Sequence, residues 1–375
     1  MGDIADIVGG GTPSTGNQSY WDGDIDWYAP AEIADQIYAN SSQKKITGLG
    51  YENSSAKMLP PGTVLFTSRA GIGKTAILTR KGCTNQGFQS IVPHRGELDS
   101  YFIFSRTEEL KRYGELVGAG STFVEVSGKQ MAVMELMMPP TMREQQTIGG
   151  FFQQLDHLIT LHQRKFEKLT NVKKSMLEKM FPQNGSSYPE IRFKGFTDPW
   201  EQRKFEEIAV RSSVICSDDT LPRVEYEDIV SGTGRLNKDI YAKQSIKSGI
   251  AFHQGDVLYG KLRPYLQNWL LPTFDGLAVG DFWVLQPQNA DSSFLYRLIQ
   301  SRQFDEVANQ STGTKMPRAD WKLVSKTVFS IPSNISEQAA IGTYFTALDS
   351  LITLHQRELE KLQNIKKSML EKMFV

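Results

Sequence analysis

The sequence predicts an α+β protein in which two globular domains with curled β-sheets are joined by two long helices, and the helices form an antiparallel coiled coil with pseudo-twofold symmetry. Three observations carry this prediction. The chain contains a long internal repeat, and each copy of the repeat has the apolar spacing of a coiled coil. The remainder consists of short β-favouring runs broken by glycine and proline.

The internal repeat is the strongest signal in the chain. Residues 144–181 align with residues 337–374 without a gap, at a constant offset of 193, and 27 of these 38 positions are identical. Outside the repeat the two halves keep this register more weakly, as Gly120 and Gly313 illustrate. The chain is therefore two copies of one unit, each with a variable globular part followed by a nearly constant segment.

Each copy of the repeat is predicted to form one long helix, because its apolar residues recur at alternating spacings of four and three. The residues expected to pair the helices are Phe152, Leu155, Ile159 and His162 in the first copy and Phe345, Leu348, Ile352 and His355 in the second. We expect the two helices of one chain to pair with each other, and dimerisation of each helix with another molecule is the alternative. The two histidines are expected to be core residues rather than metal ligands.

The repeat also sets the predicted domain boundaries. Residues 1–141 and 182–335 are predicted to be the globular α+β domains, and the second of them begins with a short preamble at 182–204. Residues 142–181 and 336–375 are predicted to be the two coiled-coil helices.

Composition excludes several classes of protein. The chain has 42 lysine plus arginine residues and 42 aspartate plus glutamate residues, so bulk charge cannot hold it on nucleic acid, although a few placed side chains can still read base edges. Cys83 and Cys216 are too few for a disulfide framework or a zinc site. The chain lacks an apolar membrane span and signal-peptide features, which predicts a cytoplasmic protein without membrane contact.

Two apparent enzyme motifs are incomplete. The run SRAGIGKT at 68–75 resembles a phosphate-binding loop, but Ser68 stands where that motif needs glycine, and the aligned stretch at 261–266 has lost the pattern. A DNA adenine methylase would need Asn/Asp-Pro-Pro-aromatic, and neither Pro-Pro pair fits it. We therefore expect no catalysis, metal or cofactor in this chain. A P-loop-like NTPase and a protein-only coiled-coil scaffold are the alternative functions.

Basic loops at matching positions of the two domains favour nucleic-acid binding. Basic and hydroxyl side chains of this kind contact DNA phosphates and base edges. The predicted DNA-binding residues are Arg69, Lys74, Ser121 and Thr122 in the first domain and Lys261, Arg263, Thr314, Lys315 and Arg318 in the second. A protein-only scaffold does not explain why two diverged domains keep such loops.

Several motifs add to this organisation, namely GTPST at 11–15, YWDGDIDW at 20–27 and GSTF at 120–123 in the first domain, and PWE at 199–201 and GTK at 313–315 in the second. Together they resemble the specificity subunit of type I restriction-modification systems, over essentially the whole chain. The resemblance implies that each globular part is a target recognition domain that reads one half of a split DNA sequence. It also implies that the helix pair sets the distance between the halves and docks two methylase subunits.

The same resemblance implies that chemistry resides in partner proteins. The methylase subunits would bind S-adenosylmethionine, the restriction subunits would use ATP and Mg²⁺ for translocation, and double-stranded DNA would be the target. One feature departs from the family pattern, because the preamble at 182–204 has no counterpart before Met1. In the family such a segment helps to close the pseudo-symmetric ring.

Overall fold

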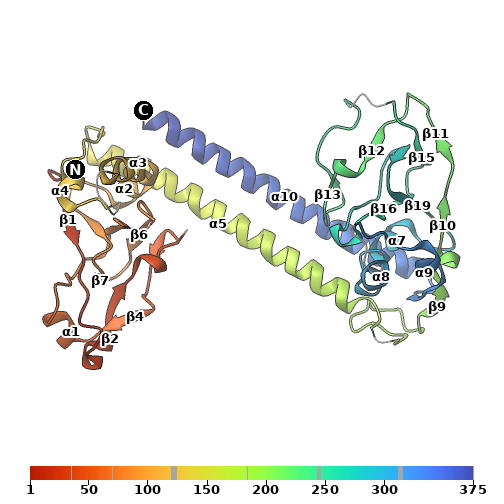
Figure 1. Cartoon of the computed structure of the whole chain (residues 1–375), viewed down its shortest axis with the longest axis horizontal. Coiled ribbons are helices and arrows are strands. Elements are labelled where there is room, and N and C mark those ends of the chain that lie inside the picture. Colours follow the sequence, from red (N-terminus) through yellow and green to blue (C-terminus); the bar gives the residue numbers. More distant parts are fainter. Residues whose placement is uncertain are drawn as a thin grey trace. The chain divides into compact units, whose positions relative to one another are not determined.

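The computed structural model describes residues 1–34, 36–69, 71–119, 125–183, 185–242, 246–310 and 316–374. The chain divides into two compact units, unit 1 with Met1–His162 and Glu358–Val375, and unit 2 with Gln163–Arg357. Two long helices, α5 (Met142–Lys179) and α10 (Ile335–Met373), each contribute to both units (Figure 1). The predicted α+β class and the two long helices are confirmed.

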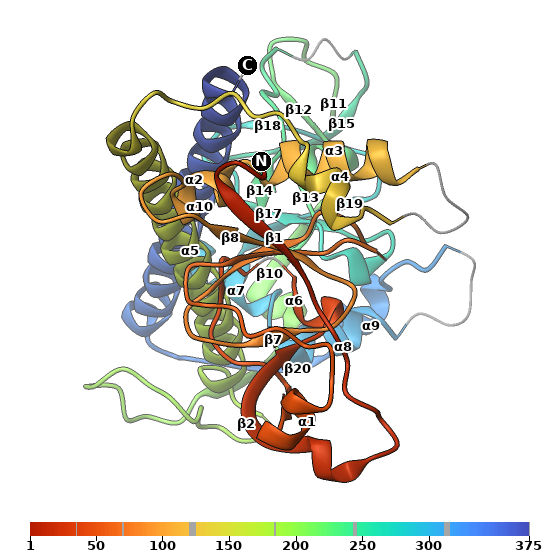
Figure 2. The same ribbon diagram turned by 90° about the vertical axis from the view of Figure 1, so that its left-hand side faces the viewer.

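The globular domain of unit 1 contains two open sheets. The larger sheet has the order β1-β8-β5-β6-β3, and the smaller has the order β4-β2-β7. Their strands are β1 (Ala5–Gly9), β2 (Trp21–Tyr28), β3 (Tyr38–Ala39), β4 (Lys44–Ile46), β5 (Val64–Phe66), β6 (Thr75–Leu78), β7 (Cys83–Thr84) and β8 (Gln89–Pro93). Strand β2 changes register between Trp21 and Ile25 and bends next to α1 (Gly48–Glu52), as Figure 2 shows.

Helices cover the larger sheet of unit 1. They are α2 (Ser100–Ser105), α3 (Thr107–Gly118) and α4 (Gly128–Ala132). One core joins this sheet to the long helices, because Phe66 of β5, Phe102 of α2 and Phe152 of α5 are fully buried in one cluster. Leu362 and Phe374, from the end of the second repeat, pack on the same cluster.

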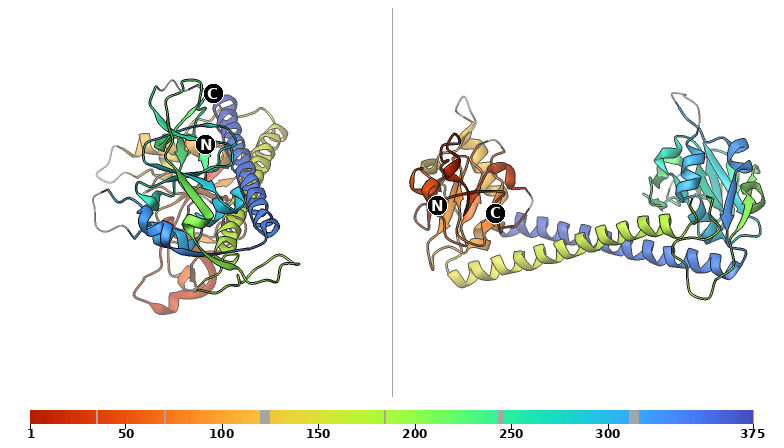
Figure 3. Two further views of the ribbon diagram at one scale, coloured as in Figure 1. Left: turned by 90° about the vertical axis from the view of Figure 1, so that its right-hand side faces the viewer. Right: turned by 90° about the horizontal axis from the view of Figure 1, so that it is seen from below.

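The globular domain of unit 2 is also α+β, and Figure 3 shows it from two directions. Its sheets have the orders β10-β19-β16-β17, β11-β15-β18-β12, β13-β14 and β20-β9. The strands are β9 (Glu201–Lys204), β10 (Ala209–Ser212), β11 (Ile215–Cys216), β12 (Arg223–Glu225), β13 (Ile229–Val230), β14 (Arg235–Leu236), β15 (Gly249–Phe252), β16 (Val257–Gly260), β17 (Trp269–Leu270), β18 (Gly276–Val279), β19 (Phe282–Pro287) and β20 (Val328–Ile331). The helices are α6 (Phe205–Ile208), α7 (Ser292–Leu298), α8 (Arg302–Ala308) and α9 (Trp321–Lys326).

The two long helices run antiparallel in each unit. In unit 1 the end of α10 lies beside the start of α5, where Lys366 Nζ is 2.6 Å from Asp156 Oδ1. In unit 2 the end of α5 lies beside the start of α10, where Lys173 Nζ is 2.7 Å from Asp349 Oδ1. Both lysines and both aspartates are equivalent at the repeat offset of 193. Each unit therefore contains the same interhelical ion pair.

Burial along the helices follows the apolar spacing in part. Phe152 and Phe345 are fully buried, and Leu155 and Leu348 are also buried. The remaining positions that were predicted to pair the helices, namely Ile159, His162, Ile352 and His355, are half-buried. Both histidines have interaction partners.

Each long helix is attached to its own domain by a glutamine. Gln145 Oε1 accepts a hydrogen bond from the backbone N–H of Asp99 at 3.0 Å, and Gln338 Oε1 accepts one from Asp291 at 2.8 Å. The two aspartates cap α2 and α7 by accepting hydrogen bonds from backbone N–H groups of those helices. Within the described residues, no helix is long and apolar enough to cross a membrane.

Candidate nucleic-acid interface

The basic loop of the first domain is a tight connection between β5 and β6. The Thr67 backbone N–H donates to Lys74 O at 3.0 Å, and the Thr67 hydroxyl accepts from the Lys74 backbone N–H at 2.9 Å. Gly71 and Gly73 have φ values of +75° and +92°, which a glycine adopts without strain. The run 68–75 thus joins two antiparallel strands, whereas a phosphate-binding loop joins a strand to a helix.

The predicted DNA-binding cations of the first domain differ in their partners. Arg69 Nε lies 2.8 Å from Glu125 Oε1, and the neighbouring backbone is fixed by a hydrogen bond from Val126 N–H to Ser68 O at 3.0 Å. Lys74 is exposed and forms no ion pair within the described part of the chain. Arg69 is therefore already partly neutralised, and Lys74 is available to a ligand.

The second domain places its basic loop in the same way. The Ala319 backbone N–H donates to Lys261 O at 2.9 Å, and both residues lie 193 positions after Val126 and Ser68. The Arg263 backbone N–H donates to Pro317 O at 2.8 Å. The structure therefore brings Lys261, Arg263 and Arg318 together at the end of β16.

An acidic residue controls the charge of this cluster. Asp281 accepts from Arg318 Nη2 at 3.1 Å and lies 3.5 Å from Lys261 Nζ. Partial burial opposes the ionised form of Asp281, but the hydrogen bond and charge of Arg318, aided by Lys261, outweigh this effect and lower the pKa of the carboxyl. Asp281 therefore stays charged at neutral pH and offsets part of the positive charge of the loop.

Arg263 is the most available cation of this cluster. It is exposed, has a left-handed backbone with φ of +49°, and forms no ion pair among the described residues. It stands directly before the short helix Pro264–Leu266, in which the Tyr265 side chain is 57% exposed. A guanidinium next to an exposed aromatic ring suits contact with DNA bases.

Four predicted DNA-binding residues lie outside the described residues. They are Ser121, Thr122, Thr314 and Lys315. Glu125 and Arg318, which lie just after these two stretches and are equivalent at the repeat offset, both border the basic loops.

Sequence reasoning missed the acidic partners and the aromatic residue of these loops. Glu125 and Asp281 belong to no motif, and Asp281 reaches the loop only because β19 lies beside β16. The Tyr226 hydroxyl, which donates to Leu262 O, was also missed. Tyr265 could have been found from the sequence, since nucleic-acid bases stack on aromatic side chains that lie near basic residues.

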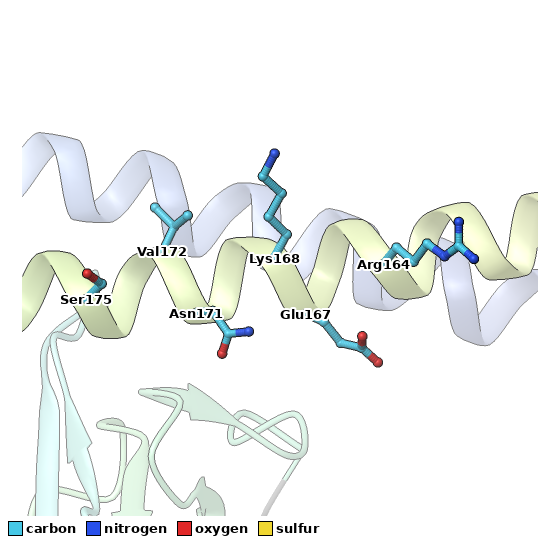
Figure 4. A pocket seen from close by; sticks show the side chains of 6 residues that line it. All are labelled: Arg164, Glu167, Lys168, Asn171, Val172 and Ser175. Atoms are coloured by element: carbon cyan, nitrogen blue, oxygen red, sulfur yellow. The ribbon is translucent and has the colours of Figure 1, made fainter. Parts of the chain in front are cut away.

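A shallow cavity of about 500 Å³ lies on α5 within unit 2 (Figure 4). It is lined by Arg164, Glu167, Lys168, Asn171, Val172 and Ser175. Lys168 and Val172 point toward α10, whereas Glu167 and Asn171 point away from it. Because the polar groups do not converge, this hollow is not an enclosed substrate site. The described residues also hold no group of three or more metal-binding side chains.

A family model and individual relatives all place the chain in one protein family. A family model described as the type I restriction modification DNA specificity domain matches residues 1–171 and 199–364. The specificity subunit of the type I restriction enzyme MjaIX from Methanocaldococcus jannaschii is 25% identical over 397 residues, which cover 99% of this chain and 90% of that protein. The specificity subunit of EcoR124I/EcoR124II from Escherichia coli is 26% identical over 166 residues, or 42% of this chain and 40% of that protein.

Solved structures share the fold along the whole chain. The S subunit of a type I restriction-modification system from M. genitalium matches with a TM-score of 0.63 at 13% identity, covering 100% of this chain and 94% of that one. A chain from a study of complex assembly and conformational transition in a type I system matches with a TM-score of 0.50 at 15% identity, covering 100% and 96%. At these identities the likeness concerns the fold.

Proposed function

Because the chain belongs to the type I restriction modification DNA specificity family, we propose that it gives a type I restriction-modification complex its DNA sequence specificity. Each globular domain reads one half of a bipartite target in double-stranded DNA. The observation that carries this proposal is that the basic loops have the same placement in both domains. Equivalent backbone hydrogen bonds, from Val126 N–H to Ser68 O and from Ala319 N–H to Lys261 O, fix this placement.

The basic residues of the two loops fall into two groups according to their ion pairs. Lys74 and Arg263 are unpaired within the described part of the chain and can meet DNA at once, whereas Arg69, Lys261 and Arg318 must share or give up a carboxylate. A sequence that offers acceptors in the right places replaces those carboxylates, and a wrong sequence does not. Together with a formal net charge of zero, this arrangement predicts modest DNA affinity for the isolated chain and a strong dependence on salt.

The long helices offer equivalent docking surfaces for two methylase subunits. The run LITLHQR occurs without change at 158–164 and at 351–357. Its first two leucines stay exposed in both copies, as Leu158 and Leu161 in unit 1 and as Leu351 and Leu354 in unit 2. Exposed leucines that are identical in two copies of a repeat suit a protein partner that binds twice. Restriction subunits join the complex that the methylases form.

Catalysis belongs to the partners in this proposal. The methylase binds S-adenosylmethionine, the restriction subunit binds ATP and Mg²⁺, and the chain has no catalytic or cofactor residues of its own. The support is that the chain lacks a methylase motif and that its phosphate-loop-like run forms a strand-to-strand turn. Purified chain with DNA and S-adenosylmethionine is expected to transfer no methyl group until methylase is added. Methylation by the chain alone would contradict this assignment.

Methylome sequencing tests the specificity role directly. A host strain that carries this chain and its methylase should show methylation at one sequence with two specific halves and an unspecific spacer. The matched control strain carries the same methylase with a different specificity subunit and should show a different sequence. The same methylated sequence in both strains would mean that the chain does not set specificity.

A further inference from the structure

The turn between β7 and β8, at residues 85–87, lies beside the basic loop of the first domain. The Ser68 backbone N–H donates to Gly87 O at 2.8 Å, and Thr67 forms an isolated β-bridge with Phe88. The connection between β5 and β6 and this turn therefore meet at one end of the larger sheet of unit 1. A ligand that contacts the basic loop is thus also close to the turn.

The backbone of this turn is held from several sides. The Asn85 backbone N–H donates to Tyr28 O at 3.0 Å, and Asn85 Oδ1 accepts from the Gly87 backbone N–H at 2.7 Å. The segment that follows β1 packs directly against the turn, because a Cβ atom on Gly10 would collide with the Asn85 carbonyl. The position of the turn therefore depends on its backbone and its neighbours, and its exposed side chain is left for another purpose.

Gln86 provides that exposed side chain. Asn85 is half-buried and Gly87 is buried, whereas Gln86 is exposed. The Thr12 hydroxyl donates to Gln86 Oε1 and so restricts the direction of the carboxamide. Among the described residues, Gln86 Nε2 donates to no other group, and Oε1 keeps a second lone pair. The side chain therefore offers both a donor and an acceptor to a ligand, in a restricted orientation.

The second domain builds the same turn with different side chains. The Lys261 backbone N–H donates to Asp281 O at 2.8 Å, which is the equivalent of the bond from the basic loop to Gly87 in the first domain. At this point the two domains are related by an offset of 194, so Gln86 corresponds to Gly280. Gly280 has a φ of +100° and no side chain to offer. The two domains thus keep one backbone frame and differ in the side chains that it carries.

The chemistry of the Gln86 side chain indicates its ligand. A carboxamide is uncharged, so it gains little from the charge of a phosphate, but it can donate and accept at the same time. In the major groove adenine presents the N7 acceptor and the N6 amino donor side by side, and a glutamine side chain pairs with both. Lys74 of the adjacent basic loop is exposed and can contact the phosphate backbone, which would bring Gln86 to the base edges.

We propose that Gln86 reads an adenine in the half of the target that the first domain binds, and that Thr12 positions the carboxamide for this contact. The inference rests on the proposed function, because it requires that the first domain binds DNA. Since Gly280 occupies the equivalent position, the second domain lacks this contact. The difference between Gln86 and Gly280 therefore contributes to the difference between the two halves of the target.

Competition binding tests Gln86 in the complex of the full chain with its methylase, on the target that methylome sequencing identifies and on its single-base variants. Gln86→Ala is expected to weaken binding to the target by about fivefold to a hundredfold and to remove the preference at one A·T pair of the first half. Gln86→Glu should shift the preference at that position toward cytosine, because a carboxylate accepts from the cytosine amino group. Gln43→Ala, at an exposed glutamine of the same domain, is the matched control and should change neither property.

A second variant separates base reading from a general loss of binding. Thr12→Val removes the hydroxyl that orients Gln86 and keeps the branched shape of the side chain. It is expected to reduce discrimination at the same A·T pair and to leave all other positions unchanged. The dependence of binding on salt should be the same for the original chain, Gln86→Ala and Thr12→Val, since none of these changes removes a phosphate contact.

The possible outcomes distinguish this inference from the proposed function. After Gln86→Ala, an equal loss of affinity on all single-base variants would assign Gln86 to the DNA backbone, and an unchanged preference would place it away from the bases. Either result would overturn the inference while the original chain keeps its target. A complex of the original chain that binds all sequences alike would overturn the proposed function, and this inference with it.

Discussion

The ion-paired aspartate of each helix forms a different network in each unit. Asp156 accepts from the Tyr101 hydroxyl at 2.9 Å and pairs with Lys366, whereas Asp349 accepts from Arg297 Nη1 at 2.7 Å and pairs with Lys173. Burial raises the pKa of Tyr101 far above its ordinary value, and the charge of Asp156 raises it further. The Tyr101 hydroxyl therefore keeps its proton and donates it in the hydrogen bond to Asp156. The lysine–aspartate ion pair is the part of the network that the two units share.

Removal of one member of this network should destabilise unit 1. Asp156→Ala is expected to lower the free energy of unfolding by about 1–3 kcal/mol, because it leaves the Tyr101 hydroxyl and Lys366 without their acceptor. Denaturant unfolding measures the change. Lys367→Ala, at the exposed neighbour of Lys366, should stay within about 0.5 kcal/mol of the original chain. Equal effects of the two substitutions would contradict the role of the network.

Arg263 is the residue whose loss should alter specificity. Arg263→Ala is expected to cost about 1–3 kcal/mol of binding to the specific site and to relax one position in the half that the second domain reads, if the guanidinium contacts a base in bidentate form. Competition binding with a set of single-base variants of the target measures both effects. Arg302→Ala, at an exposed arginine already paired with Glu306, is the control. An equal loss on all sequences would instead assign Arg263 to a phosphate.

Among the elements, the long helices were the part most visible in the sequence. The spacing of three and four located the fully buried Phe152 and Phe345, because a coiled coil constrains every turn of its helices. The ion pairs of Asp156 and Asp349 were not predicted, since a charged residue beside an apolar stripe usually faces water. The loops were located by the repeat, but their acidic partners come from strands elsewhere in the chain, and local patterns cannot show such pairings.

Two neighbouring glycines of α5 make a matched test of helix-to-domain packing. A Cβ atom on Gly149 would lie 2.7 Å from Asp99 Oδ1 and 2.9 Å from the Phe102 backbone nitrogen, whereas one on Gly150 would meet nothing within 4 Å. Gly149→Ala is expected to destabilise the protein by about 1–3 kcal/mol. Gly150→Ala should stabilise it by up to about 1 kcal/mol, because alanine favours the helix.

Thermal and denaturant unfolding distinguish the two alanine variants by the sign of the change. A stabilising Gly149→Ala substitution would mean that α5 does not approach α2 as closely as described. Gly342 is equivalent to Gly149 and approaches Ser293 of α7 in the same manner, so Gly342→Ala should repeat the destabilisation in unit 2.

The length of the helices should set the length of the unspecific spacer. Insertions of four residues after Thr170 and after Gln363, which are equivalent positions, lengthen each helix by roughly 6 Å. The apolar stripe stays nearly in register. Methylome sequencing should then show the same two half-sites with one or two more bases between them. An unchanged spacer in an active complex would leave the helices only the docking role.

For the whole molecule, the duplication predicts that the two readers act independently. Exchange of residues 1–141 for the matching domain of another family member should change one half of the methylated sequence and leave the other half unchanged. The reciprocal exchange of the second domain is the control, and it should change only the other half. Altered bases in both halves after a single exchange would show that the domains are coupled.

The glutamine contacts at the start of the two long helices have a consequence for the history of such proteins. Gln145 and Gln338 each hold a globular domain through the backbone of one helix-capping aspartate, and Gly149 and Gly342 leave room for that same turn. A newly acquired domain can thus use the same joint if it supplies a capped helix and an apolar surface for the long helix, whatever its DNA-facing loops contain. Exchange of a whole globular domain by recombination can therefore change one half of the target sequence while the long helices stay unchanged.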